Sequence, residues 1–360
     1  MSGFETLFSE LEDPRAANAS HRLCDLLVMM IAASLCGASS ATEFALFAQT
    51  RQRLLLRLID YDIAPSHDTF SRLLRLLDPK VLMQAFAVFA DAFAKALAQS
   101  GHRPKAKVVA IDGKVLRRAY GKGCQASPPL TVSAFAAESR LCLGVISGAG
   151  INEVEAAIKV VELLDLTRTI VTADALHCHH RMAEAIVAKR GDYVLALKAN
   201  RHEWLAAAES SFANPGKRKI AEIIERNHGR EEWRKAEVIA VKPLAKGHAA
   251  FIRITSQRDT AAPLVRHFMA SKKLSPETAL EVTRAHWMIE NGLHWVLDVH
   301  LDEDLARARK DNAPANIALL KRLARNILQN ADNPKVPISH RLKKCAWDDD
   351  YFVHAMTHMR

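Results

Sequence analysis

Residues 284–309, RAHWMIENGLHWVLDVHLDEDLARAR, hold a denser group of tryptophan, histidine and acidic residues than any other stretch of the chain. On a helix, side chains four positions apart lie on the same face. That spacing would align His286, Glu290, His294 and Asp298 in one polar stripe beside a mostly apolar one. The stretch is typical of an amphipathic helix with a polar outer face, or of a helix that presents Glu290 to other acidic groups. The choice between the two depends on where the other carboxylates lie.

Two aspartates follow short strand-like runs earlier in the chain. Residues 108–111 (VVAI) precede Asp112, and residues 169–173 (TIVTA) precede Asp174. If the two strands are neighbours, both carboxylates lie at one edge of the sheet. A single aspartate after a strand is more often the cap of a turn or helix. Two such aspartates and the Glu290 helix in this order favour a shared site instead.

Three converging carboxylates predict a metal site. Carboxylates held close together repel and raise each other's pKa unless a cation lies between them. Mg²⁺ suits such a site because it binds carboxylate and water oxygens, and we expect that Mn²⁺ can substitute for it. Two such ions roughly 4 Å apart can promote the in-line displacement of a phosphodiester. We therefore predict Asp112, Asp174 and Glu290 as the catalytic residues and the metal ligands, with no other cofactor.

The order of the predicted elements indicates the fold around this site. Three strands, a helix, a strand, a helix and a final strand are expected at residues 108–111, 130–135, 141–147, 152–164, 169–173, 179–190 and 193–197. This is the order of an α/β fold with a ribonuclease H-like mixed sheet. Residues 201–275 are less regular and suggest an inserted, β-containing segment before the helix that carries Glu290.

The N-terminal part of the chain has a different pattern. Apolar runs separated by glycine and proline predict helices at residues 25–36, 42–60, 68–77 and 80–100. We therefore predict an all-helical domain at residues 1–104, a catalytic domain at 105–332 and a C-terminal tail at 333–360. Within the catalytic domain, Asn312 and Pro314 predict the start of a last helix that runs to Gln329.

The charge of the chain suggests a polyanionic partner. The formal net charge is +10, yet residues 1–105 hold eleven basic and eleven acidic residues, so the whole excess follows residue 105. Such a basic body favours nucleic acid first and an anionic membrane second, and a basic protein with no such partner is the remaining alternative. The helical domain, with no net charge, is expected to contribute mainly packing.

Several features bear on the cellular compartment. The six cysteines are scattered without a C-x-x-C pair, which fits a reducing compartment. No basic stretch followed by an apolar core marks a secretory signal. The longest apolar run, residues 26–38, is too short and too rich in alanine and serine to span a bilayer. We expect a soluble cytoplasmic protein.

Two further groups of residues have competing interpretations. The run His177, Cys178, His179 and His180 resembles a zinc-binding cluster, but it lacks the second pair of ligands at fixed spacing that structural zinc requires, so polar residues at a helix start are favoured. Trp287 and Trp295 could stack on an unpaired base, although core packing is favoured for at least one of them.

Motifs along most of the chain carry a family resemblance. They are PSHDTF at 65–70, AIDGK at 110–114, VTADA at 171–175, DYVLALKAN at 192–200, HGR at 228–230, HWMIENGLHWVLDV at 286–299, DLARAR at 304–309 and DNAP at 311–314. From about Asp13 to Gln329 the chain resembles the DDE transposases of bacterial insertion sequences, of the H-repeat-associated group. The resemblance implies a ribonuclease H-like catalytic domain with an insertion, and cut-and-paste movement of the encoding element. It also implies that Asp112, Asp174 and Glu290 hold the metal ions.

The sequence departs from related transposases around the glutamate. These carry a tyrosine and an arginine before it and a lysine after it, where this chain has Thr283, His286 and Leu297. The handling of the flanking strand, including any hairpin intermediate, therefore stays open. We consider Arg284, His286 and His294 as replacements that contact phosphates, with a solvated or core-edge position as the alternative for each histidine.

The resemblance also implies DNA contacts and partners. Basic residues near the carboxylates and after the glutamate helix are expected near DNA phosphates: Lys114, Arg117, Arg118, Arg307, Arg309 and Lys310. The expected partner is double-stranded DNA, as terminal repeats and as target, bound by a homodimer in a synaptic complex within the bacterial nucleoid. The alternatives are a metal-dependent nuclease that cuts without joining, and a DNA-binding regulator on a decayed transposase scaffold.

Overall fold

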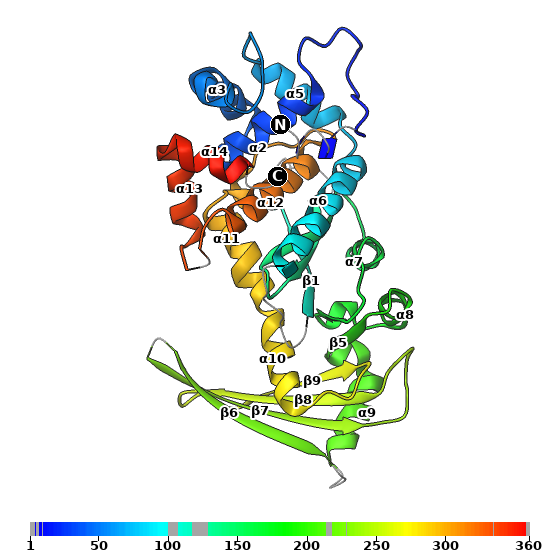
Figure 1. Cartoon of the computed structure of the whole chain (residues 1–360). Coiled ribbons are helices and arrows are strands. Elements are labelled where there is room, and N and C mark those ends of the chain that lie inside the picture. The colour runs from blue at the N-terminus through cyan, green and yellow to red at the C-terminus, as the bar shows by residue number, and fades with distance from the viewer. Residues whose placement is uncertain are drawn as a thin grey trace.

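The computed structural model describes residues 4, 7–8, 10–99, 107–116, 129–213, 218–227, 229–333 and 335–357. Among the described residues, the elements before the first strand include α2 (Leu23–Leu35), α3 (Ala41–Thr50), α4 (Gln52–Leu55), α5 (His67–Leu76) and α6 (Pro79–Gln99). Figure 1 shows α2, α3 and α5 together with the C-terminal helices at one end of the molecule, and the last strands at the other. The N-terminal part is therefore helical, as its apolar runs predict.

Local sequence explains where these helices begin and end. The side chains of Ser40 and Ser66 accept hydrogen bonds from backbone N–H groups three residues on, which caps α3 and α5. After α2 the chain turns at Gly37 with φ +93°, a conformation that glycine adopts without steric cost. The single helix predicted at residues 42–60 is wrong, because the backbone breaks at Arg51 and α4 follows as a separate short turn.

In the described part of the chain, nine strands form one mixed sheet in the order β3-β2-β1-β4-β5-β9-β8-β7-β6. Its first five strands are β1 (Lys107–Val115), β2 (Leu130–Ala136), β3 (Leu141–Gly148), β4 (Thr169–Ala173) and β5 (Asp192–Leu197). Strand β1 pairs antiparallel with β2 and parallel with β4, and β4 pairs parallel with β5. This order and these directions confirm the predicted ribonuclease H-like mixed sheet.

The predicted insertion extends this sheet. Helix α9 (His202–Ala213) leads into β6 (Lys219–Asn227), β7 (Arg230–Ala240), β8 (Ala250–Arg258) and β9 (Leu264–Ala270). Strand β9 pairs antiparallel with β5, so the added hairpins continue the hydrogen-bonded ladder rather than form a separate sheet. Figure 1 shows these strands projecting below α10 as the lower end of the molecule.

Helices cover both faces of the central strands, and strand alternation assigns each residue to a face. Val109 and Ile111 of β1 belong to the core under α7 (Glu153–Glu162) and α8 (His180–Ala188). Val108 belongs to the opposite core, under α10 (Pro276–His286). By the same alternation, Asp112 points to the α10 face and Gly113 to the α7 face.

The chain after α10 returns to the helical end. A π-helical turn (Glu290–His294), α11 (Trp295–Val299) and a short turn (Glu303–Leu305) lead into α12 (Ala313–Asn330), α13 (Ile338–Trp347) and α14 (Asp349–Thr357). The segment that the sequence left as a tail thus holds two helices, and Arg51 and Arg57 of the N-terminal part pair with Asp349 and Asp350. The domain boundaries themselves stay predictions.

Helix α12 is fixed to the edge of the sheet by a buried amide. The side chain of Asn326 donates to the backbone oxygen of Cys142 at 2.7 Å and accepts from its backbone N–H at 2.9 Å. The β2–β3 ladder shifts register at this point, between Ala134 and Phe135. β3 is an edge strand of the sheet. The Asn326 side chain therefore pairs with the backbone of Cys142 as a neighbouring strand would.

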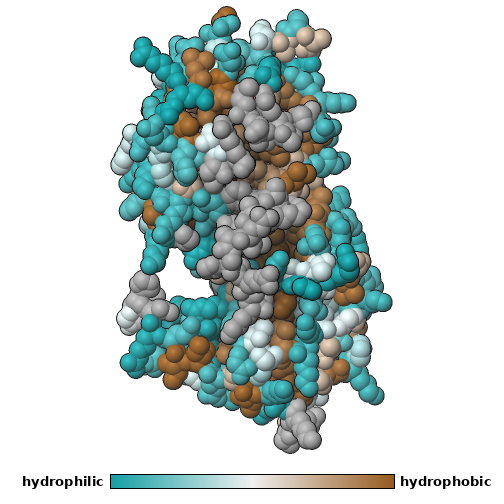
Figure 2. All heavy atoms as spheres, viewed as in Figure 1, coloured by the Kyte–Doolittle hydropathy of each residue, from teal (hydrophilic) through white to brown (hydrophobic). Residues whose placement is uncertain are grey.

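The surface is mixed in polarity. On the face in Figure 2, hydrophilic residues cover most of the helical end and of the outer strands, with hydrophobic residues scattered among them. Among the described residues, no helix combines the length and hydropathy needed to cross a membrane.

Candidate active site

Asp112 lies within a strand, not after one as we predicted. Its neighbour Ile111 pairs with Ala173, the last residue of β4, while the antiparallel ladder with β2 continues from Asp112 to Val115. The strand is longer than its apolar run because β2 supplies backbone partners after β4 has ended. Asp112 is thus the first residue of β1 beyond its parallel neighbour, at an open edge of the sheet.

Asp174 follows β4 directly, as predicted. Its Oδ1 accepts a hydrogen bond from the backbone N–H of Leu176 at 2.9 Å and caps the single turn Ala175–His177. Oδ2 is not used by that cap, so the side chain both ends the strand and presents a carboxylate oxygen at the edge. Because Asp112 and Asp174 each follow a member of the Ile111–Ala173 pair, the two aspartates lie side by side in sequence register.

Glu290 opens the π-helical turn rather than lying inside a continuous helix. Helix α10 ends at His286, and the turn widens the backbone between Glu290 and His294. Such turns occur mostly as single insertions, often at functional sites. Gly292 makes the close approach to the sheet possible, because a Cβ there would lie 3.1 Å from the ring of Phe135. The even stripe predicted from His286 to Asp298 is therefore interrupted in its middle.

The turn brings His294 between the two carboxylates. Its Nδ1 lies 3.5 Å from Oδ2 of Asp112 and 3.6 Å from Oε2 of Glu290. One ligand atom from each of these three residues lies within 4.8 Å of the others, and this group, here called the Asp112 cluster, is the one set of such closeness among the described residues. His294 is 6% exposed, and its Nε2 has no hydrogen-bond partner in the described part of the chain.

Burial and neighbouring charges together determine the electrostatics of the Asp112 cluster. Burial raises the pKa of Asp112 to about 6, and the charges of Glu290 and Asp174 add to this effect while His294 opposes it. The hydrogen bond with His294 lowers the pKa of Glu290. A divalent cation would relieve the repulsion, so carboxylate oxygens, an imidazole nitrogen and the edge position fit a metal ion.

Asp174 lies near the Asp112 cluster but is not one of its three residues. Its charge acts on both Asp112 and His286. The ring of His286 lies beside β4, with Nδ1 3.1 Å from Oγ1 of Thr172, and burial lowers its pKa. His286 therefore borders the site from the α10 side.

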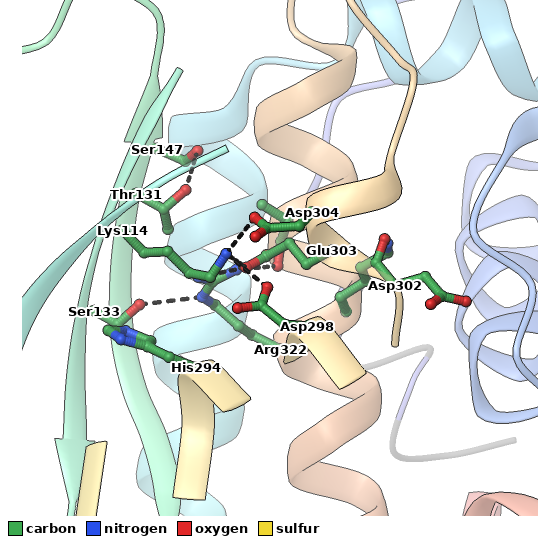
Figure 3. A network of polar contacts seen from close by, with 12 residues as sticks. Lys114, Thr131, Ser133, Ser147, His294, Asp298, Asp302, Glu303, Asp304 and Arg322 are labelled. Carbon is green, nitrogen blue, oxygen red and sulfur yellow. Dashed lines mark hydrogen bonds and ion pairs between the residues drawn. The ribbon is translucent and has the colours of Figure 1, made fainter. Parts of the chain in front are cut away.

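Lys114 lies in an acidic pocket. Its Nζ lies 2.7 Å from Oδ1 of Asp298, 2.7 Å from Oδ1 of Asp304 and 3.6 Å from Oε2 of Glu303, as Figure 3 shows. Burial opposes the charge, but the three carboxylates outweigh it and raise the pKa of Lys114. The expectation that Lys114 contacts DNA phosphates does not fit this arrangement, because its ammonium group is already surrounded by acids.

A second, deeper ion pair supports that pocket. Arg322 of α12 donates to Oε1 of Glu303 at 2.5 Å and to Oγ of Ser133 at 3.1 Å, and both charged side chains are almost fully buried. No sequence pattern beyond the acidic run at residues 302–304 indicated this pair, since Arg322 lies on another helix. The network ties β1, β2, α12 and the segment after α11 together close to the Asp112 cluster (Figure 3).

The other residues predicted to bind DNA fall into three groups. Arg284 pairs with Glu225 of β6. Arg307, Arg309 and Lys310 are exposed in the segment that precedes α12. Arg117 and Arg118 lie outside the described residues.

The structure also places the two tryptophans and the histidines of the HCHH run. Trp287 and Trp295 are 50% and 52% exposed, so core packing is wrong for both. The guanidinium of Arg266 lies over the ring of Trp287 at 5.3 Å. In the HCHH run, His179 caps α8 by accepting from the backbone N–H of Met182, as a polar helix start predicts. His180 packs edge-on against Trp204.

Comparisons with known proteins agree with this geometry. A family model described as "Transposase DDE domain" matches residues 103–327, and one described as "DDE_Tnp_1-associated" matches residues 6–90. The chain belongs to the DDE transposase family. Membership implies a phosphoryl-transfer enzyme that uses divalent metal ions.

Relatives of this DDE transposase chain carry the names of putative transposases. It is 30% identical over 357 residues to "H repeat-associated putative transposase YhhI" of Escherichia coli (strain K12), covering 93% of this chain and 92% of the relative. It is 30% identical over 355 residues to "Putative transposase YncI" of Escherichia coli O157:H7, covering 93% and 89%. The predicted resemblance to the H-repeat-associated group is confirmed.

A solved structure also matches, "Cryo-EM structure of piggyBac transposase synaptic complex with hairpin DNA (SNHP)". Its TM-score is 0.41 at 11% identity, over 98% of this chain and 77% of that chain.

The sequence predicts departures from related transposases at Leu297 and Thr283, and both side chains lie in the interior. Leu297 is fully buried, and Thr283 is 8% exposed. The hydroxyl of Thr283 donates to the backbone oxygen of Ala279 at 2.7 Å. Neither side chain is therefore available to a DNA strand.

Proposed function

We propose that this protein is an active DNA transposase that cleaves the ends of its insertion sequence and joins them to target DNA. The observation that carries the proposal is the convergence of Asp112, Glu290 and His294 within 4.8 Å, with Asp174 directly after the adjacent strand β4. These residues come from three segments far apart in the chain. Their convergence at one edge supports the assignment of Asp112, Asp174 and Glu290 as the catalytic carboxylates.

The donor set supports binding of Mg²⁺ or Mn²⁺. Carboxylate oxygens suit both ions, and the imidazole of His294 adds a donor that Mg²⁺ seldom uses. When bound, two such cations supply activation of the attacking oxygen and stabilisation of the leaving oxygen. Asp112, Asp174 and Glu290 would hold the cations. Asp174 also caps the turn that follows β4, and His294 lies between Asp112 and Glu290.

Exposed cationic and aromatic groups support double-stranded DNA as the partner. The formal net charge is +10, and Arg307, Arg309 and Lys310 lie exposed after the segment that carries Glu290. The half-exposed rings of Trp287 and Trp295 on the same segment offer surfaces for an unpaired base. Arg117 and Arg118 remain candidates for phosphate contact. Joining two element ends calls for a homodimer in a synaptic complex, working at the nucleoid.

A cleavage assay on the DNA that flanks the native gene tests the proposal. The protein is expected to cut at the element ends only with Mg²⁺ or Mn²⁺, and to join pre-cut ends to a target plasmid. Asp174→Asn should reduce cutting by more than about 100-fold, beyond what loss of an outer-shell partner costs, while end binding in a gel-shift assay persists. Undiminished cutting by Asp174→Asn would remove the proposal.

The same assay separates the two alternatives. Cutting without joining of pre-cut ends indicates a nuclease. Binding of the ends without metal-dependent cutting indicates a regulator.

A further inference from the structure

An arginine of the inserted strands lies at the edge of the sheet where the candidate carboxylates gather. Ala173, the residue before Asp174, lies beside Leu195 of β5. Two residues on, Leu197 pairs with the β9 residue that follows Arg266. Two strand spacings of about 4.8 Å and two residues of about 3.3 Å then separate Arg266 from Asp174, which puts their Cα atoms on the order of 12 Å apart.

Arg266 also faces the same side of the sheet as those carboxylates. Phe268 of β9 packs in the core under α10, and side chains two positions apart on a strand share a face, so Arg266 points to the α10 face. Ile170 of β4 belongs to the same core, so Asp174 points to that face by the same alternation, as Asp112 does. Strand order and alternation thus bring Arg266 to the approach to the candidate site.

The ring of Trp287 supports the guanidinium of Arg266. Helix α10 ends at His286, and the ring of the next residue, Trp287, has its centre 5.3 Å from the guanidinium carbon. Trp287 is 50% exposed and lies three residues before Glu290. Stacking on an aromatic face orients a guanidinium and leaves its N–H groups free to donate.

The charge of Arg266 is not balanced by an acid. In the described part of the chain its guanidinium forms no ion pair with a carboxylate. By contrast, Arg284 pairs with Glu225, and Lys114 is surrounded by acids. Arg266 therefore keeps its charge available for an anion from solution.

A second cation lies opposite Arg266. Continuing the β5–β9 register beyond Leu197 brings Lys198 opposite Arg266, and Lys198 is exposed, with an extended backbone at φ −138° and ψ −179°. Like charges directly opposite each other on neighbouring strands destabilise a sheet. An anion bound by both side chains removes that repulsion, and a phosphate suits it because a guanidinium donates two parallel hydrogen bonds to phosphate oxygens.

We infer that Arg266, oriented by Trp287, binds a phosphate of the DNA backbone close to the scissile bond. Successive phosphates of one strand are about 3.4 Å apart along the helix axis. A separation on the order of 12 Å from Asp174 therefore corresponds to about three or four nucleotides. The inference rests on the proposed function for the identity of the bound polymer, and it adds a ligand from the inserted strands that the sequence did not predict.

Fluorescence anisotropy on the full chain, without divalent ions, tests the inference with labelled duplexes that tile the DNA flanking the native gene. Arg266→Gln should bind the tightest of these duplexes about tenfold more weakly. The slope of log affinity against log salt concentration should fall in magnitude by about 1. Arg266→Lys keeps the charge but not the planar group that stacks, so it should keep the slope and lose less affinity.

The matched control is Arg190→Gln. Arg190 is exposed at the opposite end of β5, and its replacement removes the same charge, so this variant should bind as the unchanged protein does. If Arg266→Gln binds like Arg190→Gln, the inference is wrong. A loss of affinity with an unchanged salt slope would also contradict it, because that result indicates a structural role.

Replacing single phosphates by uncharged methylphosphonates identifies the contact itself. In the unchanged protein, replacement of the contacted phosphate should weaken binding about tenfold. In Arg266→Gln the same replacement should have no effect, because its partner is already absent. An effect that persists at every position in Arg266→Gln would overturn the inference. Should Arg266→Gln fail to fold, Arg266→Met, which keeps the apolar stem, takes its place.

Cleavage of the element ends separates this inference from the proposed function. A protein that does not cut, yet shows the Arg266-dependent phosphate contact, contradicts the function and keeps the phosphate site. A protein that cuts, and whose Arg266→Gln variant binds and cuts as Arg190→Gln does, keeps the function and contradicts the phosphate site. Equal, weak binding of all flanking duplexes by every variant contradicts both.

Discussion

The Nδ1 atom of His294 lies 3.5 Å from Oδ2 of Asp112. The two residues are 182 positions apart, and the π-helical turn brings the histidine to the strand edge. On a regular helix, His294 would lie on the same face as Glu290, and the sequence alone would not show that either side chain reaches β1. The extra width of the turn is thus part of how the site is assembled.

This contact predicts a metal-binding defect in His294→Asn. The variant should bind Mn²⁺ about 10- to 100-fold more weakly at one site, because the imidazole either binds the ion or orients the two carboxylates that do. Titration followed by electron paramagnetic resonance measures the affinity. His300→Asn, a histidine on the same stretch that packs against Trp295, is the control and should bind as the unchanged protein does. Equal affinities in the two variants would contradict the assignment.

Gly113→Ala should cost little stability. The new Cβ would meet the end of the Glu153 side chain, which can rotate away, so the cost in stability should stay below about 1 kcal/mol. At Gly191, by contrast, a Cβ would lie 2.8 Å from Leu166 Cβ and 3.3 Å from a backbone oxygen. Gly191→Ala should therefore cost about 1–3 kcal/mol. Urea unfolding of both variants provides the comparison.

Lys114→Met should destabilise the protein strongly. The lysine side chain is 10% exposed and faces three carboxylates, and removing one member of a buried charge group costs about 3–5 kcal/mol. The free energy of unfolding from urea titration measures the loss. Lys159→Met on the exposed face of α7 is the matched control, with an expected change within about 0.5 kcal/mol. A loss of DNA affinity without a loss of stability would instead restore Lys114 as a phosphate ligand.

Because Lys321 is buried, we expect the free energy of unfolding to rise with pH. Burial lowers its pKa from 10.5 to about 8. Between these two values the unfolded chain binds more protons than the folded one, so the free energy of unfolding rises with pH. The full difference corresponds to about 3 kcal/mol. Lys321→Met should unfold with a flatter pH profile than the unchanged protein from about pH 8 to 9.5, and should be more stable than it at pH 7. Parallel profiles would show that the buried amine is not responsible.

The sequence predicted much of the fold because its strands carry strong local signals. The buried runs of β1, β4 and β5 are short, apolar and rich in β-branched residues, and the order of elements was enough to indicate the sheet. The end of β1 was predicted at Ile111 instead of Val115, because residues 112–115 are held by pairing with β2, a tertiary effect with no local pattern. The break at Arg51 and the two C-terminal helices were missed for similar reasons, since packing against other helices determines them.

The sequence pointed to the acids of the candidate site and not to their neighbours. Asp112 and Asp174 were chosen because they follow apolar runs, and Glu290 because of the unusual composition of its helix, and their catalytic role stays a prediction. Sequence spacing could not show that Asp298 and Asp304 fold back onto Lys114, so a phosphate contact of Lys114 also stays a prediction.

The continuity of the sheet has a mechanical consequence. Residues 267–270 of β9 pair with residues 194–197 of β5, so backbone hydrogen bonds join the outer hairpins to the strands that end beside Asp112. A load placed on the outer strands would therefore be transmitted through the sheet toward Asp112.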